Sequence, residues 1–122
     1  MKKFELDTNY EYEDGQLLVI ARTDEKVFFL KNGIEFYPCE IFNKNGNEAV
    51  TVYYPKTTLE ADENAPCSPA KHSDIEEWIN DAENAFDDDA RKNHFMYASE
   101  DDFTSDDIGN LLTLVRLLKK RL

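Results

Sequence analysis

The chain has 122 residues, 41% of them apolar, which fits one domain with a core of its own and excludes wholesale disorder. Its 26 acidic and 14 basic residues give a net charge of −12, which repels phosphates and argues against direct nucleic-acid binding. We expect an α+β protein with a single domain over residues 1–122, in which an antiparallel sheet is followed by helices.

The first part of the chain, residues 1–54, predicts an antiparallel β-meander of four to five strands over residues ~3–54. A type I′ hairpin turn needs positive φ at both central residues, so an Asn-Gly or Asp-Gly pair signals such a turn. Three pairs do so here: Asp14-Gly15, Asn32-Gly33 and Asn45-Gly46. The expected strands include Leu17–Arg22, Lys26–Leu30, Ile34–Phe42 and Glu48–Tyr54. Pro38 lacks an amide hydrogen, so we expect it at a sheet edge or a bulge.

Apolar residues occupy both faces of the middle strands. One face is predicted to carry Leu17, Val19, Val27, Phe29, Ile34 and Phe36. The opposite face is predicted to carry Leu18, Ile20, Phe28 and Leu30. A sheet that is apolar on both faces has to be covered on both, and the helices are the expected cover for one of them.

The second half begins with a predicted flexible connector, residues 55–71, which has three prolines and no apolar periodicity. The helical part, residues 72–122, is predicted to hold two helices, at ~73–87 and ~105–121. Ser73 and Glu76 have the spacing of a capping box at the start of the first helix. Its apolar stripe is Ile75, Trp78, Ile79, Ala82, Ala85 and Phe86.

The last helix is predicted to begin after Ser105 as its N-cap. Its core stripe is predicted to be Ile108, Leu111, Leu112, Val115 and Leu118. Leu114 and Leu117 widen this stripe, and a dimer interface is a second use for the added width. The chain is therefore expected to be a monomer or a homodimer.

No pattern of catalytic or metal-binding residues is complete in this sequence. The possible zinc ligands, Cys39, Cys67, His72 and His94, lack the close pairing typical of structural zinc sites. A calcium loop starting at Asp89 fails where glycine is required, because His94 stands there. The chain has no phosphate-binding glycine loop and no nucleophile signature. We therefore expect no enzyme activity, no metal and no cofactor. In a cytoplasmic protein Cys39 and Cys67 are expected to be free thiols, and a bridge between them requires a fold that brings them together.

Acidic residues are concentrated in one part of the chain. Residues 60–107 contain 16 acids and 3 bases, while the last fifteen residues contain four bases and no acid. Carboxylates three or four residues apart on a helix rise by about 5 to 6 Å, which is of the same order as the spacing of nucleic-acid phosphates. This pattern predicts an acidic partner-binding surface formed by Glu76, Glu77, Asp81, Asp87, Asp88, Asp89, Asp101 and Asp102. The alternative is a solvated surface that only keeps the protein soluble.

Several short stretches resemble small proteins carried by phages and mobile genetic elements. They are the opening Met1–Leu6, the run Ala21–Thr23 with Val27, the Asn32-Gly33 pair and the run Gly46–Glu48. Acidic proteins of that origin include anti-CRISPR and antirestriction inhibitors, some of which are DNA mimics. The resemblance implies an inhibitor whose partner is a basic nucleic-acid-binding protein or nuclease.

Two other functions remain open from the sequence: an immunity protein that neutralises a cognate toxin, and a dimeric non-catalytic regulatory module. Glu5 and Asp7 interrupt any apolar stretch of a signal peptide, and no apolar run has the length of a membrane span. We therefore expect a cytoplasmic protein that makes no membrane contact.

Overall fold

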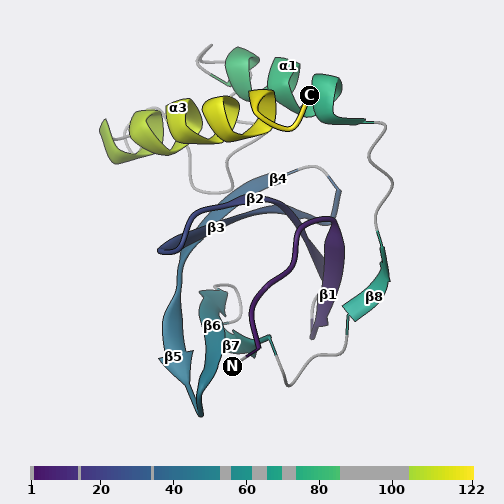
Figure 1. Ribbon diagram of the computed structural model, residues 1–122, viewed down its shortest axis with the longest axis vertical. Coiled ribbons are helices and arrows are strands. Elements are labelled where there is room, and N and C mark those ends of the chain that lie inside the picture. Colours follow the sequence, from purple (N-terminus) through teal and green to yellow (C-terminus); the bar gives the residue numbers. More distant parts are fainter. Residues whose placement is uncertain are drawn as a thin grey trace.

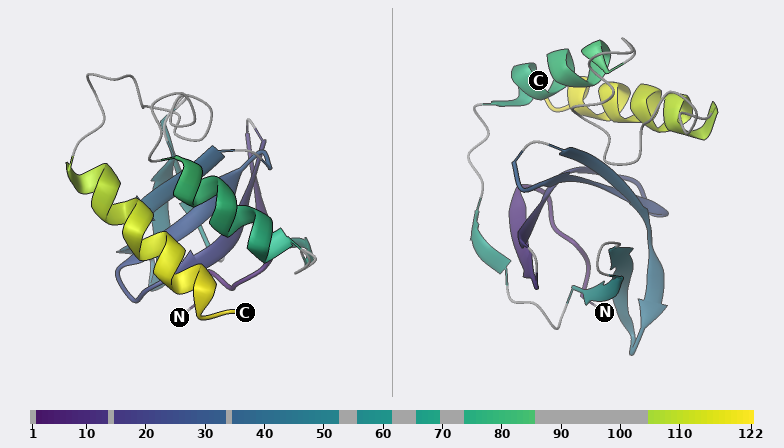
Figure 2. Two further views of the ribbon diagram at one scale, coloured as in Figure 1. Left: turned by 90° about the horizontal axis from the view of Figure 1, so that it is seen from above. Right: turned by 180° about the vertical axis from the view of Figure 1, so that it is seen from behind.

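The computed structural model describes residues 2–13, 15–33, 35–52, 56–61, 74–85 and 105–122, together with the backbone of 66–69. Within these ranges the fold is α+β, as predicted, and has three layers (Figures 1 and 2). Two helices cover one face of a five-stranded sheet, and a three-stranded sheet lies on its other side.

The five-stranded sheet has the strand order β4-β3-β2-β1-β8. Its strands are β1 (Thr8–Tyr12), β2 (Gly15–Arg22), β3 (Lys26–Lys31), β4 (Glu35–Glu40) and β8 (Pro66–Pro69). All neighbouring strands are antiparallel, so β1 to β4 form the predicted meander. Two of the three predicted hairpin turns are confirmed, because φ is positive at Asn32, Gly33, Asn45 and Gly46. Asp14 of the third pair lies outside the described residues, and Gly15 is already part of β2, where it pairs with Tyr12. Pro38 lies on β4, an edge strand of this sheet.

The three-stranded sheet consists of β5 (Phe42–Lys44), β6 (Asn47–Val52) and β7 (Thr57–Glu60), in that order. It corrects two expectations. The predicted strand Ile34–Phe42 is interrupted at Ile41, where the chain leaves the first sheet for the second. The predicted connector 55–71 contains β7 and β8. β7 pairs with β6 and β8 pairs with β1, and these pairings between strands cannot be inferred from the local sequence of the connector.

Both faces of the five-stranded sheet are covered, as predicted. Leu17, Val19, Val27 and Phe29 face the small sheet, while Ile20, Phe28 and Leu30 face the helices. Phe36 was predicted on the wrong face. It pairs with Leu30 across the β3–β4 ladder and packs under the helices, because residues directly opposite each other share a face. Ile34 lies outside the described residues.

A β-bulge in β2 sets which side chains face which layer. Val19 pairs with Phe29 and Ala21 with Phe28, so Ile20 is an extra residue in this strand. Ile20 and Ala21 consequently both face the helices. Beyond the bulge the alternation is reversed, and Arg22 lies on the side of the small sheet, where it bonds to Glu48.

The helix layer consists of α1 (Ile75–Asn84) and α3 (Ser105–Lys119), which pack side by side (Figure 2). Asp74 precedes α1 without a side-chain cap, and Ser73 lies outside the described residues. Ser105 is the first residue of α3 rather than its N-cap.

The buried stripe of α3 is narrower than predicted and centred differently. Leu111, Leu114 and Leu118 are buried, whereas Ile108 and Leu112 are 41% and 58% exposed. Successive helical residues are turned by about 100°, so Leu112 points away when Leu111 faces the sheet. Neither described helix is both long and apolar enough to cross a membrane.

Candidate partner-binding surface

The outer side of α1 carries the part of the predicted acidic site that the structure describes. Its inner side packs on the core through Ile75, Trp78, Ile79, Ala82 and the adjoining Ala85. This anchoring turns the acidic side chains outward: Asp74, Glu76, Glu77 and Glu83 are exposed, and Asp81 is half-buried. We call these five residues the α1 acidic face. The other predicted site residues, Asp87, Asp88, Asp89, Asp101 and Asp102, lie outside the described residues.

The α1 acidic face contains no positive charge of its own. No Lys or Arg occurs in the helix, and the side chains of Glu76, Glu77, Asp81 and Glu83 form no ion pair with any described residue. Glu76 and Glu77 favour the positive end of the helix dipole, but Asp81 and Glu83 approach its negative end. Glu77 and Asp81 are also a like-charge pair four residues apart. The stability of the helix therefore does not account for this full set of acids.

A groove lies between α3 and the β3–β4 edge of the five-stranded sheet. It consists of two hollows of about 400 and 460 Å³ that share Glu40, Ile41 and Asn110. Lys26 Nζ donates to Asn110 Oδ1 across the first hollow at 2.7 Å, so the groove is bridged where the turn after β2 meets the helix. Nothing in the sequence placed these residues together, because Lys26 and Asn110 are 84 residues apart.

The described residues offer no metal centre and no reactive thiol. No group of three or more His, Cys, Asp or Glu in the described ranges has the geometry of a metal site. Cys39 is a free, buried cysteine, and burial raises the pKa of its thiol to about 12. The thiol therefore stays protonated at neutral pH, a form that neither binds zinc nor attacks a substrate. His72 and His94 lie outside the described residues, as does the side chain of Cys67.

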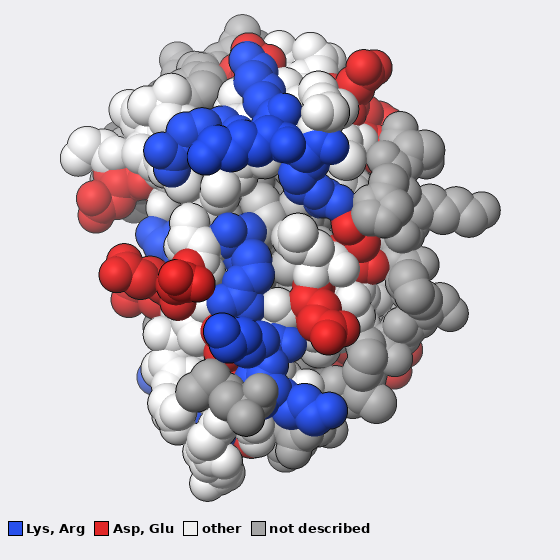
Figure 3. Space-filling model, viewed as in Figure 1, with Lys and Arg blue, Asp and Glu red and all other residues white. Residues whose placement is uncertain are grey.

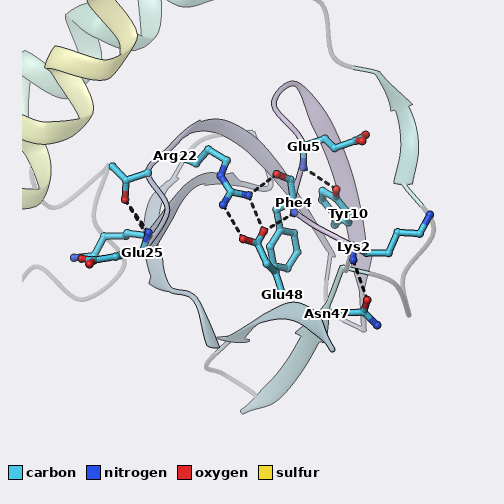
Figure 4. A network of polar contacts seen from close by, with 10 residues as sticks. Lys2, Phe4, Glu5, Tyr10, Arg22, Glu25, Asn47 and Glu48 are labelled. Carbon is cyan, nitrogen blue, oxygen red and sulfur yellow. Dashed lines mark hydrogen bonds and ion pairs between the residues drawn. The ribbon is translucent and has the colours of Figure 1, made fainter. Parts of the chain in front are cut away.

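A buried polar network ties the N-terminal segment 2–7 to both sheets (Figure 4). Arg22 donates to Glu48 through both terminal nitrogens, at 2.7 and 2.8 Å, and to the carbonyl oxygen of Phe4 at 2.7 Å. The Phe4 amide donates to Glu48 Oε1 at 2.8 Å. The hydrogen bond to Glu48 raises the pKa of Arg22. Burial alone would raise the pKa of Glu48, but the hydrogen bonds from Arg22 and Phe4 outweigh it and lower that pKa.

Comparisons with known proteins add no relative to this picture: no family model, no curated protein and no solved structure matches the chain. The resemblance to phage and mobile-element proteins therefore stays a prediction.

Proposed function

We propose that this protein is a non-catalytic inhibitor that binds a basic, nucleic-acid-handling protein through the α1 acidic face. The observation that carries the proposal is that the outer side of α1 carries four acids, Glu76, Glu77, Asp81 and Glu83, and that the helix contains no cation. Such a surface is complementary to a site lined with Lys and Arg and accelerates encounter with it. A CRISPR effector or a restriction nuclease is the target class that we favour, in agreement with the resemblance in the first half of the chain.

Charge alone steers two proteins together more than it holds them, so an apolar contact has to supply affinity. Ile108 and Leu112 are the exposed apolar side chains on α3, the helix that packs beside α1. They are four residues apart and so lie on one side of the helix. In this proposal the partner's basic surface contacts α1, and an apolar part of the same surface covers Ile108 and Leu112.

The test is a tagged pull-down from bacterial lysate, washed at low and then at high salt, with captured proteins identified by mass spectrometry. The wild-type chain is compared with the variant Glu76→Lys, Glu77→Lys, Asp81→Lys. The matched control is Glu13→Lys, Asp24→Lys, Glu25→Lys, which changes the net charge equally at exposed positions outside the helix. Circular dichroism checks that each variant folds, because lysines in the first turn of α1 oppose the helix dipole.

We expect one stoichiometric nuclease or nucleic-acid-binding protein whose capture weakens as salt screens the charges. The α1 variant should lose it while the control variant retains it. Equal capture by both variants, or a partner held unchanged at high salt, would mean that the α1 acidic face is only a solvated surface.

An immunity protein that neutralises a toxin nuclease would use the same acidic surface, and its specificity separates it from our first proposal. Such a protein protects cells against one toxin and leaves CRISPR and restriction enzymes active. We do not favour a dimeric module that pairs through Leu114 and Leu117, because Leu114 is 1% exposed and Leu117 packs against the core.

A further inference from the structure

A band of cations crosses the face seen in Figure 3, although the chain as a whole is strongly acidic. In the same view of the ribbon, α3 ends at the top of this face and the N-terminus lies near its lower end (Figure 1). Both chain ends are rich in exposed cations that form no ion pair with any described residue. We call these residues the terminal basic band: Lys2, Lys3, Arg116, Lys119 and Lys120.

Two paired arginines hold the ends of the band in place. Arg121 donates to the carbonyl oxygen of Ile20 at 2.7 Å and to the carboxylate of Asp7, which fixes the end of α3 beside the N-terminal segment. Arg22 fixes the same segment at Phe4. Segment 2–7 therefore runs between the two groups of cations, with Glu5 as its one exposed acid.

The composition of the band indicates what kind of partner it fits. Four of its five members are lysines, a residue that protein–protein interfaces contain in low proportion. Phe4 and Tyr10, the aromatic residues of residues 2–10, are 1% and 2% exposed, so this part of the chain offers no aromatic side chain for stacking on bases. An elongated row of exposed cations that form no ion pair with any described residue is the footprint of a site for a phosphate backbone.

We propose that the terminal basic band binds the phosphate backbone of duplex nucleic acid without reading its sequence. This departs from the expectation of no direct nucleic-acid contact, which averaged the charge over the whole chain. Exposed charges further away than the Debye length, about 8 Å at physiological salt, are largely screened, so the local cations dominate at contact. The remaining acids keep the affinity low, and the contact matters where another protein already holds the duplex nearby.

The test uses a fluorescein-labelled DNA duplex of 20 base pairs and fluorescence anisotropy over a series of salt concentrations starting at about 20 mM. The variant Lys119→Gln, Lys120→Gln removes two cations of the band, and Lys2→Gln, Lys3→Gln removes two at its other end. The control Lys26→Gln, Lys44→Gln makes the same change in net charge at positions outside the band. Circular dichroism confirms that all three fold.

For the wild type we expect log K to fall with log salt with a slope no steeper than about −4.5, the value for five phosphate contacts. Each band variant should flatten this slope by roughly 1.8, and the control should leave it unchanged. Absence of binding at about 20 mM salt would overturn the proposal, as would equal effects of band and control variants. Equally tight binding of labelled poly-glutamate would assign the band to acidic proteins instead. The result is independent of the α1 acidic face, because neither its residues nor its partner enter the assay.

Discussion

Arg22 and Glu48 form a bidentate ion pair that joins the five-stranded sheet to the three-stranded sheet, with Nη1–Oε1 at 2.7 Å and Nη2–Oε2 at 2.8 Å. Their side chains are 16% and 8% exposed. Phe4 bonds to both partners through its backbone, so the pair also holds the N-terminal segment between the sheets. Removal of either charge leaves the other one buried, which makes this pair a sensitive point of the fold.

Glu48→Gln should lower the free energy of unfolding by about 2–4 kcal/mol, because the Arg22 guanidinium keeps its buried position but loses its counter-charge. Urea denaturation followed by tryptophan fluorescence of Trp78 measures the change. Glu40→Gln is the matched control at an exposed strand position, where we expect less than about 0.5 kcal/mol. A similar loss in both variants would contradict the structural role of the ion pair.

The lowered pKa of Glu48 predicts part of the pH dependence of stability. A carboxyl group whose pKa is lower in the folded state stabilises that state fully above its unfolded value, near 4.3, and loses this contribution as pH falls through the folded value. Stability curves measured between about pH 6 and pH 2.5 should therefore fall less steeply in Glu48→Gln than in the wild type. Parallel curves would show that other carboxyl groups dominate acid unfolding.

Arg121, which follows α3, should contribute to the free energy of unfolding, whereas its neighbour Lys120 should not. Arg121 is 14% exposed at its side chain and links α3 to Asp7 and Ile20. Arg121→Ala should cost about 2–3 kcal/mol, whereas Lys120→Ala, at an exposed neighbouring position, should change stability by less than about 0.5 kcal/mol. Thermal unfolding of the two variants side by side measures this difference.

Two glycines should respond in opposite directions to replacement by alanine. A Cβ at Gly15 would lie 2.0 Å from Asn32 Oδ1, the atom that accepts the Gln16 amide at 3.0 Å, so Gly15→Ala should destabilise by roughly 1–3 kcal/mol. A Cβ at Gly109 in α3 meets nothing within 4 Å, and Gly109→Ala should stabilise by about 0.5–1 kcal/mol. Chemical denaturation decides both, and a destabilising Gly109→Ala would mean that α3 packs differently there.

Cys39 should resist thiol reagents in the folded protein. Its pKa of about 12 and its burial keep it protonated and covered at pH 8, so it presents neither the thiolate nor the access that a disulfide reagent needs. In a Cys67→Ser background, which leaves Cys39 as the single cysteine, labelling should be at least about a hundredfold slower than in denaturant. Rapid labelling of folded protein would place Cys39 nearer the surface than the core packing shows.

Local sequence was enough to predict the parts of the fold that depend on local chemistry. The two Asn-Gly turns, the apolar alternation of β2 and β3 and the inward stripe of α1 follow from backbone preferences and periodicity. The outward direction of Glu76 and Glu77 follows as well, because a helix with one buried stripe exposes the other side. The α1 acidic face was therefore predictable as a pattern, although its partner is a proposal.

The sequence by itself determined the order of the strands in the meander, the α+β class and the acidic helix, because each depends on neighbours a few residues apart. Tertiary structure alone decided the second sheet, the pairing of β7 and the shift of the α3 stripe away from Ile108 and Leu112. The bulge at Ile20 shows the physical reason. One extra residue, set by the pairing of β2 with β3, turns Arg22 toward Glu48, and this contact joins residues 26 positions apart that no local pattern connects.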